Sequence, residues 1–352
     1  MLPPRDPDKR LKARGTDTRP DGRFEPHQRL RESDGWDIPE DSHLLRTQVT
    51  VERPRSIITR NTSPDISFDR SVNPYRGCEH GCIYCYARPT HAYLGLSPGL
   101  DFETRITAKP DAAELLAREL ARPSYRPAPI ALGTNTDPYQ PVESRLAIMP
   151  GILRVLSDWN HPVTLVTRGQ TVLRDLDLWA ELAAKRMAAV GVSITTLDGG
   201  LARTMEPRAP APATRLRMIR ELSSAGVPVR VMVAPVIPYL TDSTAHLDSL
   251  LEALAEAGAS GVTAFPMHLR SSTKPWFLEW LAGEHPALIR RYRGLYGRGA
   301  YVTPEYSSWL RDRMKPLVHR HGLAGSGGLR QSGPDSPATV AAPELQHALT
   351  LF

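Results

Sequence analysis

Short apolar runs alternate with longer segments of helical period between about residues 70 and 270. The runs are rich in β-branched residues and recur about every 30 to 40 residues, a spacing typical of a strand, a helix and two loops. Alternation of this kind indicates βα units that build a parallel sheet. The runs predicted as strands are 72–76, 130–133, 163–167, 190–195, 229–234 and 261–265.

The segments between the runs carry helix signals of their own. In 244–257 four leucines fall at i, i+3, i+4 and i+7, Asp242 or Ser243 can cap the start, and Gly258 can end the helix. Six such units predict an α/β fold, a partial (β/α)6 TIM-like barrel of parallel strands with function at the carboxyl ends of the strands. An open doubly wound sheet remains the alternative, because periodicity does not separate the two.

The pattern changes after Met267, where the βα units stop. Three later segments, 276–280, 286–296 and 304–319, are predicted as C-terminal helices that cover the barrel. The ends of the chain are poor in large apolar residues and are predicted as disordered tails. We therefore expect a basic N-terminal tail at 1–50, a barrel domain with its covering helices at 51–320, and a flexible Gly, Ser, Pro and Ala-rich tail at 321–352.

Composition agrees with a globular enzyme. The 352 residues are 41% hydrophobic and 23% charged, and no apolar run reaches the roughly 18 to 20 residues needed to cross a bilayer. We expect a cytoplasmic protein without membrane association. The net charge of +6 is compatible with an anionic partner, but much of the excess lies in the N-terminal tail, which we interpret as a solvated extension rather than a nucleic-acid arm.

Three cysteines, Cys78, Cys82 and Cys85, are the only ones in the chain and follow the spacing CxxxCxxC. An odd, clustered trio indicates metal rather than disulfides. Three thiolates from one tight loop can wrap one side of a cubane cluster and leave the fourth iron open, and Gly77 and Gly81 permit the turns that such a wrap requires.

A structural zinc site with His80 or His91 as fourth ligand is the alternative. It is less favoured, because zinc sites usually place pairs of cysteines on two separate knuckles, whereas the three cysteines of this chain lie in one loop and no second knuckle exists. That alternative would make the protein a zinc-stabilised nucleic-acid-binding module without catalysis.

The loop resembles the cluster motif of the radical S-adenosylmethionine (SAM) superfamily, with Tyr84 at the aromatic position before the last cysteine. The longer string at 73–88, NPYRGCEHGCIYCYAR, is similar to the branch related to spore photoproduct lyase, and the resemblance continues to about residue 270. It implies a [4Fe-4S] cluster on the three cysteines, SAM bound to the open iron, a one-electron reductant such as flavodoxin or ferredoxin, and a 5′-deoxyadenosyl radical that abstracts hydrogen from the substrate.

Polar residues follow the predicted strands, where such a fold would bind SAM. The polar residues directly after 130–133 fit the place where the superfamily binds the SAM ammonium group, although they also form an ordinary turn pattern. Arg168 is a candidate to pair with the SAM carboxylate; the alternative is a surface arginine that caps a loop. Hydroxyls after the next strand suit the ribose or methionyl group, and the apolar backbone near Val236 suits adenine. The further cofactor candidates are Tyr84, Thr134, Asn135, Thr136, Asp137, Ser193 and Thr195.

The substrate side is less defined. Arg208 lies in a Pro-fixed loop that either binds an anionic group or carries no chemistry, and His268 follows the sixth strand. Spore photoproduct lyase has a further cysteine that returns hydrogen to the product radical, whereas this chain has none. We therefore doubt spore photoproduct repair. Tyr86, Tyr139 and Tyr239 are the candidate hydrogen donors, with recycling from 5′-deoxyadenosine as the alternative.

The absence of further cysteines also excludes auxiliary clusters on this chain and methyl transfer through an additional thiol. What remains is hydrogen abstraction followed by rearrangement, cleavage or oxidation. Nucleic acid is the first candidate substrate.

Overall fold

The computed structural model describes residues 14–16, 46–62, 68–270 and 272–325. Most of the two predicted tails therefore lies outside the described residues. The first strand, β1 (Gln48–Val51), spans the predicted boundary between the N-terminal tail and the barrel domain.

A seven-stranded sheet forms the centre of the molecule, in the order β10-β9-β8-β7-β6-β3-β2. Every neighbouring pair is parallel except β2 and β3, which are antiparallel. The prediction of six parallel strands is confirmed. The strands are β2 (Ile58–Arg60), β3 (Arg70–Val72), β6 (Ile130–Leu132), β7 (Val163–Thr167), β8 (Ala188–Ser193), β9 (Val229–Val236) and β10 (Gly261–Pro266).

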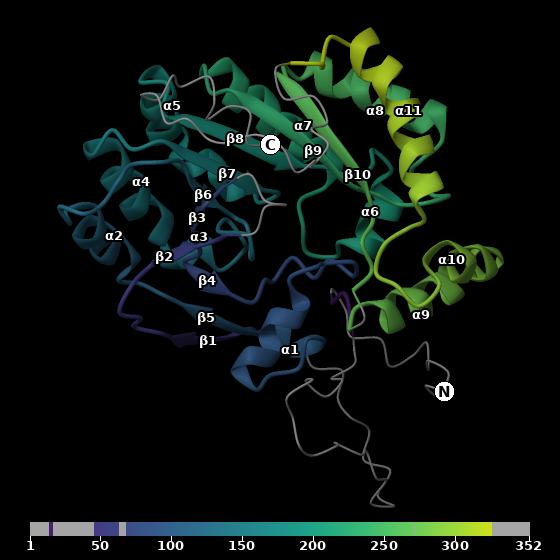
Figure 1. Ribbon diagram of the computed structural model, residues 1–352, viewed down its shortest axis with the longest axis horizontal. Helices are drawn as coiled ribbons and strands as arrows, with labels where there is room; N and C mark the ends of the chain where they lie inside the picture. Colours follow the sequence, from purple (N-terminus) through teal and green to yellow (C-terminus); the bar gives the residue numbers. More distant parts are fainter. Residues whose placement is uncertain (1–13, 17–45, 63–67, 271, 326–352) are drawn as a thin grey trace, which may run out of the picture.

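The sheet is open, because β10 and β2 stand at its two edges and do not pair with each other. Helices lie along its outside, and Figure 1 shows them following the strands around the sheet. This arrangement confirms the α/β class. The helices of this layer are α2 (Ala112–Leu120), α4 (Ile148–Asp158), α5 (Leu176–Ala184), α7 (Pro212–Ser224), α8 (Thr244–Glu256) and α11 (Pro304–Arg320).

Burial explains the sequence pattern. All six residues of β8 are buried, as expected for a parallel strand covered on both faces. In α8 the four leucines of the predicted apolar face are buried, the side chain of Ser243 accepts a hydrogen bond from the His246 amide, and Gly258 follows the helix with φ +85°. The predicted cap and stop of this helix are therefore confirmed.

The predicted leading strand at 72–76 is wrong in detail. Val72 ends β3, and after Pro74 the chain enters β4 (Tyr75–Arg76), which pairs antiparallel with β5 (Arg105–Ala108) in a separate sheet of order β1-β5-β4. Pro74 has no amide hydrogen to continue a ladder, so one apolar run is divided between two sheets. This small sheet and α1 (Leu100–Thr104) lie beside the start of the cysteine loop (Figure 1).

The predicted C-terminal helices are present as α9 (Lys274–Glu284), α10 (Ile289–Tyr296) and α11. Aromatic residues of α9 and α10, Phe277, Trp280 and Tyr292, share an apolar cluster with Cys82 and Tyr84. The covering helices therefore pack against the cysteine loop. The shorter elements are η2 (Arg88–Leu94), α3 (Glu143–Leu146), η3 (Gln170–Asp175), α6 (Gly199–Met205) and η4 (Pro286–Leu288).

Within the described ranges, none of the helices is both long enough and apolar enough to span a membrane.

Candidate active site

The cysteine loop turns where its glycines stand. Gly77 and Gly81 have φ values of +79° and +70°, in the left-handed region that favours glycine, as the sequence predicted. A Cβ atom at Gly77 would lie 2.9 Å from the carbonyl oxygen of Phe102, and one at Gly81 would lie 2.9 Å from Glu103 Oε2. Both the backbone conformation and the close packing therefore require glycine at these turns.

The thiols of this loop are mostly withdrawn from solvent. Cys78 and Cys82 are buried and Cys85 is partly exposed. Burial, and after it the charges of Asp137 and of the other two cysteines, raises the pKa of Cys78 well above its usual range. Burial likewise raises the pKa of Cys82 to about 12, although the Arg168 guanidinium opposes the shift. Burial therefore disfavours the thiolate forms of both side chains.

Side chains from the main sheet fix the loop from one side. His80 Nε2 lies 3.1 Å from Asp137 Oδ2, and Gln140 bridges the loop by accepting from the Glu79 amide and donating to the Gly77 carbonyl. Burial alone would raise the pKa of Asp137, but the hydrogen bond and charge of His80 outweigh it and lower the pKa to about 2. The loop is thus tied to the end of β6.

A buried ion pair holds the other side. Arg88 donates to the Cys82 carbonyl and pairs with Glu103, and both side chains are fully buried. The Arg88 guanidinium also lies over the rings of Phe102 and Trp276, at 5.4 and 5.5 Å. Breaking such a pair would leave an uncompensated buried charge, so the loop conformation is strongly specified.

Arg168 extends from the end of β7 directly to the cysteine loop. Its Nη1 lies 3.0 Å from Cys82 Sγ, 3.2 Å from Tyr84 Oη and 2.9 Å from Glu206 Oε1, and its Nη2 donates to Ser193 Oγ at 3.2 Å. The structure therefore does not place this arginine at the surface.

Glu206 is the centre of the same network. Its carboxylate accepts hydrogen bonds from Tyr84, Thr195, Arg168 and Arg215 and is almost fully buried. Burial would raise the pKa of Glu206, but the charges of Arg215 and Arg168 outweigh it and lower the pKa to about 2. One carboxylate thus faces two guanidinium groups. The excess positive charge next to Cys82 favours an anionic group at this position.

The predicted cofactor residues divide into two sets. Tyr84, Arg168, Ser193 and Thr195 are brought together in the Glu206 network. The polar residues directly after β6 instead make contacts within the protein. Thr134 and Asn135 donate hydrogen bonds to the side chain of Asn73. Thr136 donates to the Tyr75 carbonyl, and Asp137 pairs with His80. Val236 is buried in the main apolar core.

The three predicted hydrogen donors lie in different places. Tyr86 follows Cys85, is half-exposed, and donates to the Thr134 carbonyl at 2.5 Å. Tyr139 is buried in the main core, where it donates to Asp175 and accepts from Trp179. Tyr239 lies against the rings of Tyr292 and Tyr306. The structure brings only Tyr86 to the cysteine loop.

The substrate candidates also separate. Arg208 Nη2 lies 3.1 Å from Glu79 Oε1, and its amide donates to the His80 carbonyl, so its loop packs on the cysteine loop. His268 stacks with Phe265 and contacts the edge of Tyr301 beyond β10.

Glu206 and Arg215 are functional candidates that sequence reasoning did not assign. Arg215 carries a signal that was available: together with Met218, Ile219 and Leu222 it occupies i, i+3, i+4 and i+7 of the buried face of α7. A charged residue on an apolar helix face needs a buried partner. Its partner, Glu206, could not be identified from spacing alone.

The donor set is compatible with an iron–sulfur cluster. Three thiols lie on one loop, the turns are fixed by glycine, and the adjacent network carries excess positive charge. Among residues 14–16, 46–62, 68–270 and 272–325, no group of three or more His, Cys, Asp or Glu side chains is assembled as for a metal ion. Both ring nitrogens of His80 already face oxygen atoms, of Asp137 and Arg208.

Comparison with known proteins identifies the class. The family model described as the radical SAM superfamily matches residues 72–251, about half of the chain. An uncharacterized protein of Mycobacterium tuberculosis is 48% identical over 277 residues, which cover 79% of this chain and 80% of the relative. The chain belongs to the radical SAM superfamily, and the resemblance seen in the sequence is confirmed.

Other similarities are more distant. An uncharacterized protein of Acidianus two-tailed virus is 28% identical over 216 residues, covering 58% of this chain and 69% of the viral protein. Among solved structures, a spore photoproduct lyase variant has a TM-score of 0.61 at 17% identity, covering 79% of this chain and 80% of that one. This likeness confirms the TIM-like fold.

The chain is therefore an enzyme of the radical SAM class. The alternative of a zinc-stabilised binding module without catalysis is set aside.

Proposed function

We propose that Cys78, Cys82 and Cys85 hold a [4Fe-4S] cluster and that the enzyme uses it to cleave SAM reductively, with a flavodoxin or ferredoxin as electron donor. When bound, the cluster would supply the electron that gives a 5′-deoxyadenosyl radical. The observation that carries this proposal is the contact of Arg168 with Cys82 inside a network of excess positive charge. The Arg168 charge opposes the effect of burial on the pKa of Cys82 and so favours the thiolate form that the cluster requires.

The polar side chains around Cys82 have defined roles in this proposal. Arg168 pairs with the SAM carboxylate while Glu206 holds its guanidinium in place, and Ser193 and Thr195 present hydroxyls to the ribose or methionyl group. Thr134, Asn135, Thr136 and Asp137 shape the strand end that faces the SAM ammonium, and Val236 contributes apolar backbone for adenine. Tyr84 orders the network through its hydroxyl.

The proposed reaction is hydrogen abstraction from a substrate, with nucleic acid as the first candidate class. The structures similar to this chain include a spore photoproduct lyase variant with bound AdoMet and dinucleoside spore photoproduct, at 17% identity. Arg208 and His268 are the proposed substrate contacts. Tyr86 is the favoured hydrogen donor, because its hydroxyl lies between the cysteine loop and the end of β6.

The remaining assignments are proposals of the same kind. Residues 51–320 would form the catalytic domain, with 1–50 and 321–352 as tails. A reduced cluster needs a reducing compartment, so we propose the cytoplasm.

The direct test is anaerobic reconstitution of the full chain with iron and sulfide. A brown protein with about four irons per chain is expected. After dithionite reduction it should convert SAM to 5′-deoxyadenosine and methionine, quantified by mass spectrometry. Iron-replete, reduced protein that neither binds nor cleaves SAM would overturn the proposal.

The substrate class needs a separate readout. Deuterated candidate nucleic acids are incubated with the active enzyme, and transfer of deuterium into 5′-deoxyadenosine is measured. Transfer from a nucleic acid supports the class, whereas SAM cleavage without label transfer from any of them contradicts it.

A further inference from the structure

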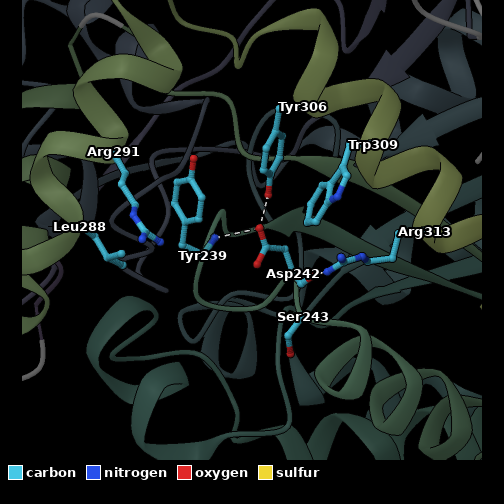
Figure 2. A pocket seen from close by; sticks show the side chains of 8 residues that line it. All are labelled: Tyr239, Asp242, Ser243, Leu288, Arg291, Tyr306, Trp309 and Arg313. Carbon is cyan, nitrogen blue, oxygen red and sulfur yellow. Dashed lines mark hydrogen bonds between the residues drawn. The ribbon is translucent and has the colours of Figure 1, made fainter.

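A cavity of about 390 Å³ lies outside the group of residues that bond to the cysteine loop. It is bounded by the segment after β9, by the start of α10 and by α11 as far as Arg313 (Figure 2). The side chains that matter for its chemistry are Tyr239, Asp242, Arg291, Tyr306, Trp309 and Arg313. Its volume lies at the small end of ligand pockets, enough for one small molecule.

Aromatic rings form its walls. Tyr239 and Trp309 are each 39% exposed, unusually accessible for such large side chains. Tyr306 packs between them, with ring centroids 6.3 Å from Tyr239 and 5.2 Å from Trp309. Exposed rings held in place by neighbouring rings are suited to stack on a flat ligand.

Each exposed ring has a guanidinium group above it. Arg291 lies 5.5 Å from the centroid of Tyr239, and Arg313 lies 4.0 Å from that of Trp309 (Figure 2). Arg313 also donates to the backbone carbonyl of Asp242 at 2.8 Å. In the part of the chain that the structure describes, neither arginine has a carboxylate within 4.0 Å, so both charges are available to an anionic ligand.

The floor of the cavity offers an acceptor. Asp242 Oδ2 accepts from the Tyr306 hydroxyl at 2.5 Å and from the Tyr239 amide at 2.9 Å. No described residue donates a hydrogen bond to its other oxygen, Oδ1. A ligand that fills this cavity can therefore satisfy Oδ1 with an amino group.

We propose that this cavity binds a nucleotide whose base carries an exocyclic amino group. The base stacks against Trp309, its amino group donates to Asp242, and Arg291, which lies over Tyr239, contacts the phosphate. An exposed aromatic ring suits the base, a carboxylate acceptor suits its amino group, and a guanidinium without an ion pair among the described residues suits the phosphate. The same unit can come from a free nucleotide or from one residue of a polynucleotide.

The cavity is coupled by packing to the cysteine loop. Tyr306 and Leu288, which line it, pack against the apolar cluster that contains Cys82 and Tyr84. The Tyr292 hydroxyl donates to the Pro238 carbonyl, next to Tyr239. A nucleotide held here would be positioned relative to the cysteine loop. This positional role rests on the proposed function, whereas the binding itself does not.

The test uses the full chain, reconstituted anaerobically, and isothermal titration with AMP. One site is expected, with weaker binding for adenosine, which lacks the phosphate, and for IMP, which lacks the amino group. Trp309→Ala and Arg291→Gln should each weaken AMP binding on the order of tenfold, since stacking of one base and one charge-assisted contact are each of that size. Trp309→Phe should restore most of the binding.

The matched control is Arg293→Gln, because Arg293 is an exposed arginine of the same helix α10 that does not line the cavity. It should leave AMP binding unchanged. A single-stranded DNA of five nucleotides that binds more tightly than AMP identifies a polynucleotide as the source, and equal or weaker binding identifies a free nucleotide.

Three results would overturn the inference: no AMP binding at millimolar concentration, binding that Trp309→Ala and Arg291→Gln leave intact, or displacement of AMP by SAM. The last would assign the cavity to the cofactor. SAM cleavage is measured on the same preparations. Protein that cleaves SAM without binding AMP contradicts only this inference, and protein that binds AMP without cleaving SAM contradicts only the proposed function.

Discussion

The cysteine loop and the cavity between α10 and α11 use the same kinds of side chain in opposite ways. At the loop, Tyr84 and Glu206 are buried, the Arg168 side chain is only 16% exposed, and the three are bonded to one another. At the cavity, Arg291, Tyr239 and Trp309 are exposed, and the arginine has no ion pair among the described residues. Burial makes the first set part of the structure, whereas exposure leaves the second set able to bind.

The difference has energetic consequences. Removing one partner of a buried ion pair leaves a desolvated charge without compensation, which costs several kcal/mol. Removing an exposed arginine or tryptophan costs the fold little, because water replaces the lost contact. Substitutions at the two places should therefore separate stability and cofactor chemistry from ligand binding.

The largest effect is expected at the cysteines. Replacing Cys78, Cys82 or Cys85 by Ala should reduce SAM cleavage to background and lower the iron content, because the chain has no spare thiol. Iron analysis and quantification of 5′-deoxyadenosine measure this. Arg293→Gln, an exposed position of α10 outside both sites, is the control and should retain SAM cleavage. A cysteine variant that keeps full cleavage would remove the basis for the proposed cluster.

Glu206→Gln should lower the free energy of unfolding by about 3 kcal/mol, because it leaves the Arg168 and Arg215 charges buried without a carboxylate. Urea denaturation measures this. Glu181→Gln is the matched control, since Glu181 is an exposed carboxylate that pairs with Lys185 at 2.8 Å, and its removal should leave stability unchanged. Equal stability of both variants would contradict the central place of Glu206 in the network.

The Glu206 carboxylate should also make the free energy of unfolding depend on pH. The Arg215 and Arg168 charges outweigh burial and lower the pKa of Glu206 from 4.5 to about 2. Its stabilising effect is therefore fully present above about pH 4.5 and is lost as the pH falls through about 2. The difference in unfolding free energy between the wild type and Glu206→Gln should shrink over this interval. Denaturation of the metal-free proteins at several pH values measures it, and a difference that stays constant argues against an ionised Glu206.

The smallest effect is expected at the cavity. Trp309→Ala should change the free energy of unfolding by about 1 kcal/mol or less, because the ring is 39% exposed. Thermal denaturation beside the wild type measures this. A loss as large as that of Glu206→Gln would show that the cavity wall is a structural element and would weaken the comparison drawn above.

The sequence by itself determined the class of the fold and the position of the cysteine loop. Strand and helix periods reflect which faces are buried, so the six parallel strands and the leucine face of α8 could be predicted. The turns at Gly77 and Gly81 were predictable for the same local reason, since only glycine adopts a positive φ at little cost.

Only the tertiary structure decided which polar residues meet. Asp137 and Thr136 follow β6 as the pattern indicated, yet their side chains bond to His80 and to the Tyr75 carbonyl. Tyr139 lies in the core, and Glu206 joins Arg215 across the start of α7. Spacing fixes the strand end at which a residue lies, whereas its partner depends on packing between segments far apart in the chain.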